Sequence, residues 1–286
     1  MLTIENQPVK ITKFPDGTSK FTCESFLKAI SIAKTDTIVV KWLYDDDSEL
    51  FQLQCIVDWL RSNGYNNIAL HLPYVPNARM DRVPNNEMFT LKSFANFINS
   101  MNFTYVKTLD IHSNVGAALI DRIYNDSPEY YIYTILQDHL SDGNLVLFFP
   151  DEGAMKRYSP IANRFHLPYG FGMKCRDWQT GIIKGLDILG NTESLTGKDV
   201  LIIDDICSRG GTFYYSAQAL KKYNVNNIYL YVSHLENAVH EGQMIDSGLI
   251  KTVYTTDSIY RKDQAPDNHK DKIVIVDSFM QYQQES

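Results

Sequence analysis

Hydrophobic side chains recur along the chain in two alternating patterns, a helical spacing and short continuous runs. The segment Glu49–Asn63 places four hydrophobic side chains on one face of a helix, and Gly64 behind it is a typical helix end. The apolar run Ile68–Leu72 follows and ends at a proline, as expected for a buried strand. Thr90–Met101 repeats the helical spacing, and Tyr105–Ile111 predicts the next strand.

The same alternation resumes in the second half of the chain. We expect a helix at Thr212–Tyr223. We expect strands at Asn144–Phe149, Asp199–Ile203, Asn227–Val232, Lys251–Thr255 and Lys272–Val276. Alternating strands and helices indicate mainly parallel sheets with helices on both faces. Two such α/β domains, residues 1–140 and 141–286, fit a length of 286 residues. Because ligands bind beyond the carboxyl ends of the strands in such folds, the residues after each apolar run are candidates for chemistry.

Composition narrows the class of protein without indicating a reaction. With 44% hydrophobic and 21% charged residues, the chain is typical of a soluble globular protein. A formal net charge of −7 argues against a general nucleic-acid or membrane-surface binder, so local groups must hold any anionic ligand. No signal peptide opens the chain, and no apolar run approaches the ~20 residues that span a bilayer. Cys23, Cys55, Cys175 and Cys207 form no CxxC pair and no zinc-finger spacing, so we expect reduced thiols in a cytoplasmic protein.

The strongest chemical signal is the segment Val200–Thr212, VLIIDDICSRGGT. An apolar strand runs into two adjacent acids, Asp204 and Asp205, and a polar loop with two glycines then leads to a helix. Backbone N–H groups in such a loop form a cradle for phosphate, and carboxylates accept hydrogen bonds from sugar hydroxyls. A tight turn whose acids merely cap the helix is the alternative interpretation. The chain holds no GxxxxGK[ST] loop, which excludes a P-loop kinase, and Gly170-Phe-Gly172 is too short to indicate a dinucleotide site.

Asp204–Thr212 resembles the ribose-phosphate loop of type I phosphoribosyltransferases and of ribose-phosphate pyrophosphokinases. Five further segments resemble motifs of the pyrophosphokinases, in the same order: FPDGT at Phe14–Thr18, PYVPNARMDR at Pro73–Arg82, LDIH at Leu109–His112, PDEGAMKR at Pro150–Arg157 and MKCR at Met173–Arg176. The resemblance covers nearly the whole chain. It implies two tandem phosphoribosyltransferase-like domains, each a mainly parallel sheet flanked by helices. It also implies Mg²⁺-dependent transfer of diphosphate from ATP to the C1 hydroxyl of a 5-phosphorylated ribose, with release of AMP.

The resemblance further implies a role for each motif. ATP would be bound by Phe14, Asp16, Arg79, Asp81, Arg82 and His112. The phosphorylated ribose would be bound by Asp204, Asp205, Ser208, Arg209, Gly210, Gly211 and Thr212. The metal positions are His112 and Asp151, although contact of the histidine through water or phosphate is equally open. Lys174 and Arg176 would close over the migrating diphosphate as catalytic cations.

Several of these residues, taken alone, also fit structural roles. His112 alone could be a structural histidine whose hydrogen bonds are satisfied, and Asp151 alone could be a turn acid. Lys174 and Arg176 alone could form a solvated basic patch. In the family, Phe14 and Asp16 contact adenine across a subunit interface, which implies a homo-oligomer, either a dimer or a hexamer built from dimers.

The chain departs from the family pattern at three places. Thr18 replaces the family's acid after FxDG, and Met80 replaces a glutamine, so the contact with adenine is in question. In the sugar-phosphate loop, Ser208-Arg209 stands where the family usually has Asp-Thr, which removes one negative charge and adds one positive charge. A guanidinium that grips two oxygens suits a second phosphate beyond the 5-phosphate.

Two acceptors therefore remain open: ribose 5-phosphate, the family substrate, and ADP-ribose, whose 1-diphosphate would belong to NAD salvage. Two other functions also remain. A phosphoribosyltransferase would explain the sugar-phosphate loop but leave Phe14–Thr18 and Pro73–Arg82 unexplained. A catalytically silent regulatory subunit should have lost loop or metal residues, whereas Lys174, Arg176 and His112 are present.

Overall fold

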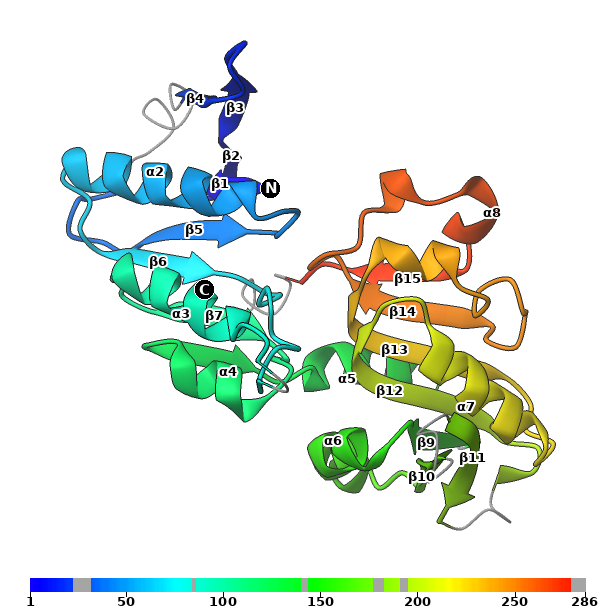
Figure 1. The fold of residues 1–286 in the computed structure, drawn as a ribbon. Helices are drawn as coiled ribbons and strands as arrows, with labels where there is room; N and C mark the ends of the chain where they lie inside the picture. Colours follow the sequence, from blue (N-terminus) through cyan, green and yellow to red (C-terminus); the bar gives the residue numbers. More distant parts are fainter. Residues whose placement is uncertain (23–31, 84–85, 140–143, 177–182, 191–194, 279–286) are drawn as a thin grey trace. The chain divides into compact units, whose positions relative to one another are not determined.

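The computed structural model describes residues 1–22, 32–83, 86–139, 144–176, 183–190 and 195–278, without the side chains of 138–139, 174–176 and 183–186 (Figure 1). The chain forms two compact units, Met1–Ser127 (unit 1) and Pro128–Ser286 (unit 2). The sequence pattern had placed the boundary at 140/141. Helix α5 (Glu129–His139) accounts for the difference, because its Tyr131 hydroxyl donates a 2.7 Å hydrogen bond to the carbonyl of Ser278 in unit 2.

Unit 1 is built on a six-stranded sheet with the strand order β2-β1-β5-β6-β7-β8. The strands are β1 (Leu2–Ile4), β2 (Gln7–Pro8), β5 (Ile38–Trp42), β6 (Ile68–His71), β7 (Val106–Leu109) and β8 (Ile123–Asp126). Strands β5 to β8 are mutually parallel, whereas β1 pairs with β2 and β5 in antiparallel register. A separate hairpin joins β3 (Lys10–Lys13) and β4 (Ser19–Thr22).

The described part of unit 1 also holds the helices α2 (Ser48–Ser62), α3 (Thr90–Ser100) and α4 (Asn114–Leu119). The apolar faces of α2 and α3 pack with alternate residues of β5 and β6 in one core. Gly64 ends α2 as its sequence position predicts: Gly64 N donates to Arg61 O and Tyr65 N donates to Leu60 O, the Schellman pattern, with Gly64 at φ +87°.

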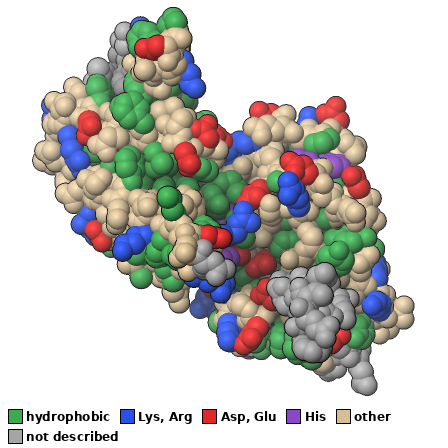
Figure 2. All heavy atoms as spheres, viewed as in Figure 1, with side chains coloured by type: hydrophobic (Ala, Val, Ile, Leu, Met, Phe, Trp, Pro, Cys, Tyr) green, Lys and Arg blue, Asp and Glu red, His purple; other side chains and the backbone are tan. Residues whose placement is uncertain are grey.

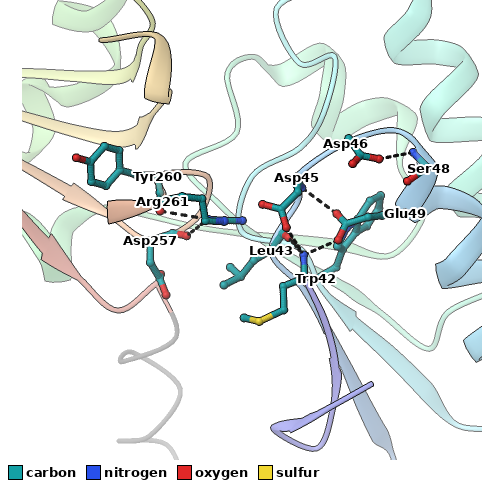
Figure 3. A network of polar contacts seen from close by, with 10 residues as sticks. Trp42, Leu43, Asp45, Asp46, Ser48, Glu49, Asp257, Tyr260 and Arg261 are labelled. Carbon is teal, nitrogen blue, oxygen red and sulfur yellow. Dashed lines mark hydrogen bonds and ion pairs between the residues drawn. The ribbon is translucent and has the colours of Figure 1, made fainter. Parts of the chain in front are cut away.

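Polar contacts tie β1 to the start of α2 (Figure 3). The amino group of Met1 donates to Leu43 O, to Asp45 at 2.8 Å and to Glu49 at 2.5 Å. Glu49 also accepts hydrogen bonds from Trp42 Nε1 and the backbone N–H of Asp45. These contacts satisfy a buried carboxylate, which would otherwise destabilise the core.

Unit 2 is built on a seven-stranded sheet with the strand order β11-β10-β9-β12-β13-β14-β15. The strands are β9 (Leu145–Phe149), β10 (Tyr169–Arg176), β11 (Ile183–Leu189), β12 (Asp199–Cys207), β13 (Ile228–Leu235), β14 (Thr252–Thr256) and β15 (Ile273–Val276). All neighbours are parallel except β10 and β11. The predicted strand Asp199–Ile203 therefore continues four residues further, through the acid pair.

The helices of unit 2 are α5, α6 (Glu152–Arg164), α7 (Gly211–Lys221) and α8 (Asp267–Lys270), with 3-10 turns η3 (Asn237–Glu241) and η4 (Lys262–Gln264). Val200 and Ile202 pack in one core with residues of α7, while Leu201 and Ile203 are buried on the opposite face of the sheet. Burial on both faces explains the continuous apolar runs of these strands. The predicted fold class, α/β with two domains of mainly parallel sheet flanked by helices, is confirmed.

The charged side chains of the visible face are mixed. Figure 2 shows Lys and Arg interspersed with Asp and Glu instead of gathered into one basic field. No described helix has both the length and the apolar character that crossing a bilayer requires. Cys55 and Cys207 are free thiols, whereas Cys23 and the side chain of Cys175 lie outside the described residues.

Candidate functional site

Two neighbouring parallel strands of unit 2 bring acidic residues to one edge of the sheet. Ile202 of β12 lies opposite Phe148 of β9, so Asp204 of β12 lies level with the turn that follows β9. Asp151 stands in that turn. The carboxyl ends of parallel strands are the usual ligand edge of such folds. The sequence separated these acids by more than fifty residues, and the fold brings them together.

Asp151 begins helix α6 as its N-cap. Its Oδ1 accepts a 3.1 Å hydrogen bond from the backbone N–H of Ala154. The turn-acid role expected for Asp151 taken alone is therefore present, and it fixes the carboxylate at the strand end. Gly153 stands close by: a β-carbon there would lie 3.3 Å from Asp151 Oδ1.

Asp204 and Asp205 are adjacent in β12, and the backbone N–H of Asp205 donates a 3.0 Å hydrogen bond to Oδ1 of Asp204. Asp205 is 4% exposed and lies on the side of α6, where Arg157 Nη1 is 3.4 Å from its Oδ2. Burial raises the pKa of Asp204 well above its usual range, and the nearby carboxylates of Asp205 and Asp151 raise it further. Three acids that repel one another around a partly desolvated centre favour a ligand that supplies hydroxyl donors or positive charge.

The loop after β12 turns into α7 at Gly210. Gly210 is the N-cap and has φ +76°, in the left-handed region where glycine is favoured. A β-carbon there would also lie 2.8 Å from Cβ of Met244, so both the conformation and the packing require glycine. Gly210 brings no side-chain cap to α7, an eleven-residue helix whose first-turn N–H groups at Gly211 and Thr212 are of the kind that bind phosphate.

Arg209 departs from the family pattern, and its side chain pairs with an acid. Its Nε and Nη2 atoms donate to the same oxygen of Glu241, at 3.0 and 2.8 Å. Both side chains are exposed, 72% for Arg209 and 61% for Glu241. The contribution of such an exposed pair to stability is small, on the order of 0–1 kcal/mol. The guanidinium is thus held beside the loop by a partner that it can leave at low cost.

In unit 1, two further motifs meet at the carboxyl edge of the sheet. The carbonyl of Pro73 accepts hydrogen bonds from Leu109 N at 3.0 Å and Thr108 Oγ1 at 3.1 Å. The start of Pro73–Arg82 therefore lies against Leu109–His112. Asp110 is 2% exposed and has φ +46°, and His112 is partly buried just before α4.

The charged end of the segment Pro73–Arg82 is open to solvent. Arg79 and Arg82 are exposed, and Arg82 Nε lies 3.6 Å from Oδ1 of Asp81. Asp81 is partly buried. The predicted ATP-binding residues Arg79, Asp81 and Arg82 thus lie on one loop at the same edge as His112, although no ligand contact is described.

Phe14–Thr18 forms the turn between β3 and β4. Phe14 N donates to Thr18 O, and Asp16 Oδ1 accepts from both Thr18 N at 3.0 Å and Thr18 Oγ1 at 2.7 Å. These bonds lower the pKa of Asp16, the side-chain bond contributing most. Thr18, which stands where the family has an acid, therefore stabilises the turn through its hydrogen bonds to Asp16. Phe14 is exposed and lies under the ammonium of Lys20, with Nζ 5.9 Å from the ring centroid.

The predicted catalytic cations stand on β10. The backbone of Lys174 and Arg176 pairs with β11, but their side chains lie outside the described part of the structure. Gly170 and Gly172 belong to the same strand, which agrees with the exclusion of a dinucleotide turn.

No cluster of three metal-ligating side chains occurs among the described residues. Mg²⁺ usually takes only one or two protein carboxylates and completes its shell with water and phosphate, so a protein cage is not required. The hard carboxylate oxygens of Asp151 and Asp204 fit this ion, since the Asp151 carboxylate lies near enough to raise the pKa of Asp204. His112 belongs to unit 1 and these acids to unit 2.

Sequence reasoning gave no role to several residues that surround the loop. Arg157 was part of a recognised motif, and its pairing with Asp205 follows only from the packing of α6 against β12. Glu241, Gly242 and Met244 belong to an irregular segment after β13 that carries no motif. Nothing in the sequence separates these residues from ordinary loop residues.

Comparisons with known proteins cover most of the chain. Residues 124–267 match the family model described as phosphoribosyl transferase domain, and residues 1–101 match the N-terminal domain of ribose phosphate pyrophosphokinase. The ribose-phosphate pyrophosphokinase of Thermococcus kodakarensis is 28% identical over 229 residues, which is 79% of this chain and 77% of the relative. That of Bacillus subtilis is 28% identical over 255 residues, 87% of this chain and 76% of the relative.

Among solved structures, the phosphoribosylpyrophosphate synthetase of Mycobacterium smegmatis is similar, with a TM-score of 0.71 at 15% identity. The alignment covers 94% of this chain and 86% of that one. At this identity the likeness supports the two-domain fold. The order of the matched domain models along the chain agrees with the order of the two units.

Proposed function

The chain belongs to the ribose-phosphate pyrophosphokinase family, and from that premise we propose that it transfers diphosphate from ATP to the C1 hydroxyl of a 5-phosphorylated ribose. The observation that carries the proposal is the edge of unit 2, where Asp151, the acid pair of β12 and the N-terminus of α7 follow two neighbouring strands. That edge offers groups for both ends of a phosphorylated sugar. The match of residues 1–101 to the N-terminal domain model supports ATP as the second substrate.

In this reaction the C1 oxygen forms a bond to the β-phosphorus of ATP, the bond from that phosphorus to the AMP oxygen breaks, and the hydroxyl loses its proton. Asp204 and Asp205 accept hydrogen bonds from the ribose hydroxyls and fix the orientation of C1. The N–H groups at the start of α7 hold the 5-phosphate, and Thr212 adds a hydroxyl donor. Arg157 keeps the carboxylate of Asp205 in place.

Charge on the diphosphoryl oxygens must be neutralised during transfer. Asp151 would hold a Mg²⁺ whose charge, when bound, offsets that of these oxygens. Lys174 and Arg176 supply further positive charge as the diphosphate moves. Arg79, Asp81 and Arg82 orient the phosphates of ATP on unit 1. A homo-oligomer in which Phe14 and Asp16 reach the adenine of a partner subunit belongs to the same proposal.

One assay separates this proposal from a phosphoribosyltransferase and from a silent regulatory subunit. AMP release is followed with ATP, Mg²⁺ and ribose 5-phosphate, without any nucleobase. The pyrophosphokinase releases AMP under these conditions. A phosphoribosyltransferase requires a nucleobase and 5-phosphoribosyl 1-diphosphate, and a silent regulatory subunit releases no AMP. Absence of AMP with every phosphorylated ribose therefore contradicts the proposal.

A second candidate acceptor is ADP-ribose, and the position of Arg209 favours it. Its guanidinium is 72% exposed, stands next to the phosphate end of α7, and is held only by an exposed acid. A planar guanidinium binds two phosphate oxygens at once, so exchange of Glu241 for a second phosphate is favourable. The product would be the 1-diphosphate of ADP-ribose, a compound suited to NAD salvage. Pairing with Glu241 alone is the competing role for Arg209.

The two acceptors are distinguished by kcat/KM measured in parallel on the native chain and on Arg209→Thr. If Arg209 binds the second phosphate, the substitution costs ADP-ribose ~1.5–3 kcal/mol more than ribose 5-phosphate. Glu241→Gln is the matched control, because it releases Arg209 without removing it and should favour ADP-ribose. Equal losses for both acceptors, or no turnover of ADP-ribose, leave ribose 5-phosphate as the substrate.

A further inference from the structure

The segment after β13, residues 236–246, begins with the 3-10 turn η3 and forms one wall of the sugar-phosphate loop. Glu236 N donates a 2.8 Å hydrogen bond to Cys207 O at the end of β12. A β-carbon on Gly242 would lie 1.9 Å from the carbonyl oxygen of Arg209, so the two backbones are in direct contact. Met244 packs against Gly210 in the same way. The conformation of the loop therefore depends on where this wall segment lies.

The wall segment is anchored by a chain of four hydrogen-bonded polar side chains, called the relay below. Tyr260 Oη lies 3.3 Å from His240 Nε2, His240 Nδ1 lies 2.9 Å from His269 Nδ1, and His269 Nε2 lies 2.8 Å from Asp246 Oδ1. The two imidazoles are stacked, with ring centroids 5.1 Å apart. His269 on α8 and Tyr260 are buried, whereas Asp246 is exposed. His240 and Asp246 both belong to the wall segment, so α8 holds it at two points.

The proton positions of the neutral pair follow from the donors and acceptors available. A carboxylate only accepts, so His269 carries its proton on Nε2 and donates it to Asp246. His269 Nδ1 is then an acceptor, which requires His240 to carry its proton on Nδ1. His240 Nε2 in turn accepts from the hydroxyl of Tyr260. All three contacts are satisfied by this one arrangement, and each bond depends on its neighbour.

Other charged groups surround this relay. Glu241, next to His240, pairs with Arg209. Asp267 and Lys270 on α8 pair with each other, and Lys272 Nζ donates to Ile245 O. None of these contacts replaces a bond of the relay, so the two histidines connect α8 to the wall segment through bonds of their own.

We propose that His240 and His269 are positioning residues of the phosphate site: their relay fixes the wall segment, and the wall segment fixes the loop. The inference rests on the proposed function in one respect, that the loop binds the 5-phosphate. Loss of the relay lets residues 240–244 move away from Arg209 and Gly210. Acceptor binding then weakens, while ATP, whose predicted residues lie in unit 1, is bound as before.

The test measures kcat and both KM values for His240→Ala, His269→Ala and His240→Asn. An asparagine side chain places its amide nitrogen near the position of histidine Nδ1 and retains the donor to His269. We expect each alanine variant to raise KM for the phosphorylated ribose by about 10-fold to 100-fold, the range found for loss of supporting contacts. KM for ATP should stay unchanged, and His240→Asn should stay close to the native chain.

The control is Asp199→Ala at the opposite end of β12, where Asp199 Oδ1 accepts three hydrogen bonds from Asn226 and Asn227. It removes a comparable polar network without touching the loop. An unchanged acceptor KM in both alanine variants overturns the inference. So does an equal rise in Asp199→Ala, or an asparagine variant as impaired as the alanine variant.

Failure of the proposed function is recognised separately, by absence of AMP release from the native chain. In that event the inference is decided by titrating inorganic phosphate and following the amide signals of Gly210, Gly211 and Thr212 by NMR. Weaker binding in His240→Ala than in Asp199→Ala supports it, and equal binding overturns it.

Discussion

At the scale of single residues, the surroundings of Asp204 and Asp205 set their chemistry more than their identity does. Although they are neighbours in one strand, the two acids have different partners: Asp204 lies beside Asp151, and Asp205 pairs with Arg157. The sequence predicts that both acids lie at a ligand edge, because an apolar run precedes them. It does not predict which acid is paired, since that depends on the face that each side chain occupies.

Asp205→Asn tests the role of the paired acid. The amide keeps the shape of the side chain and loses the charge that attracts Arg157 and the ribose hydroxyls. We expect the affinity for the phosphorylated ribose to fall by ~1.5–3 kcal/mol per lost bond, with ATP affinity largely unchanged. Isothermal titration calorimetry with each substrate measures both quantities. Unchanged sugar affinity in this variant and in Asp204→Asn would remove both acids from the site.

His71 gives a second residue-scale prediction, on stability against pH. It is buried in β6, and burial lowers its pKa from 6.5 to about 4, with smaller contributions from Lys41 and Lys107. The unfolded chain takes up a proton below its pKa of 6.5, and the folded chain does so only near 4. The contribution of neutral His71 to the stability of unit 1 is therefore fully present above pH 6.5 and is lost as the pH falls toward 4.

At 1.36 kcal/mol per pKa unit, the loss reaches about 3 kcal/mol, as an upper estimate. Hydrogen exchange of the β5 and β6 amides at about pH 7 and about pH 4.5 reports the stability of unit 1 alone. His71→Gln, which does not titrate, should show a flatter dependence. Parallel curves for the two proteins would show that His71 does not control it.

At the scale of elements, a clear apolar spacing makes an element predictable, whereas the eleven-residue α5 and the thirteen-residue α6 were not predicted from the sequence. The helices α2, α3 and α7 and the strands β6, β9 and β12 to β15 follow from their spacing, within a few residues. Hairpin β3–β4 is mostly polar or exposed, and strand β1 has only three residues, so they carry little periodic signal. The wall segment 236–246 has no regular pattern, and its contact with the loop depends on a tertiary close approach.

Gly210 joins β12 to α7, and its replacement separates backbone strain from crowding. Gly210→Ala forces a left-handed residue with a β-carbon against Met244, whereas Gly197→Ala has a similar φ of +73° and nothing within 4 Å. We expect Gly197→Ala to cost ~1 kcal/mol of unfolding free energy, and Gly210→Ala to cost ~1–3 kcal/mol more.

The two variants also differ in function. Gly210→Ala should weaken acceptor binding because the phosphate cradle shifts, while Gly197→Ala should leave it intact. Urea unfolding and acceptor KM measure the two effects. Combining Gly210→Ala with Met244→Ala should recover part of the stability. If the two single variants were equally stable, crowding by Met244 would play no part.

At the scale of the whole molecule, the predicted groups are divided between the two units. The ATP motifs and His112 belong to unit 1, and Asp151 and the sugar-phosphate loop belong to unit 2. Two domain models match the chain in the same order, which explains why motifs far apart in sequence were recognisable together. The sequence order of the motifs thus agrees with the order of the two matched domains. The anchoring of the loop by α8 was not predictable, because it joins residues that share no motif.

Metal dependence is a prediction for the reaction as a whole, and Asp151 is the residue that tests it. If Asp151 helps to hold a Mg²⁺ on the phosphate oxygens, AMP release requires the ion and stops in excess chelator. Asp151→Asn keeps a good N-cap for α6 and removes the charge, so stability should stay unchanged while kcat falls by ~10²-fold or more. Asp151→Ala should lose, in addition, the ~1 kcal/mol of the cap.

Glu152→Gln provides the control for the metal experiment. Glu152 is the neighbouring acid, is 68% exposed and pairs with Lys156 at 2.7 Å on the surface of α6. Its substitution should leave both kcat and the Mg²⁺ concentration for half-maximal rate unchanged, whereas Asp151→Asn should raise that concentration, because a carboxylate ligand is lost. Full activity in excess EDTA would rule out the metal site. Equal responses of the Asp151 and Glu152 variants to Mg²⁺ would mean that general surface charge, and not the carboxylate at the end of β9, attracts the ion.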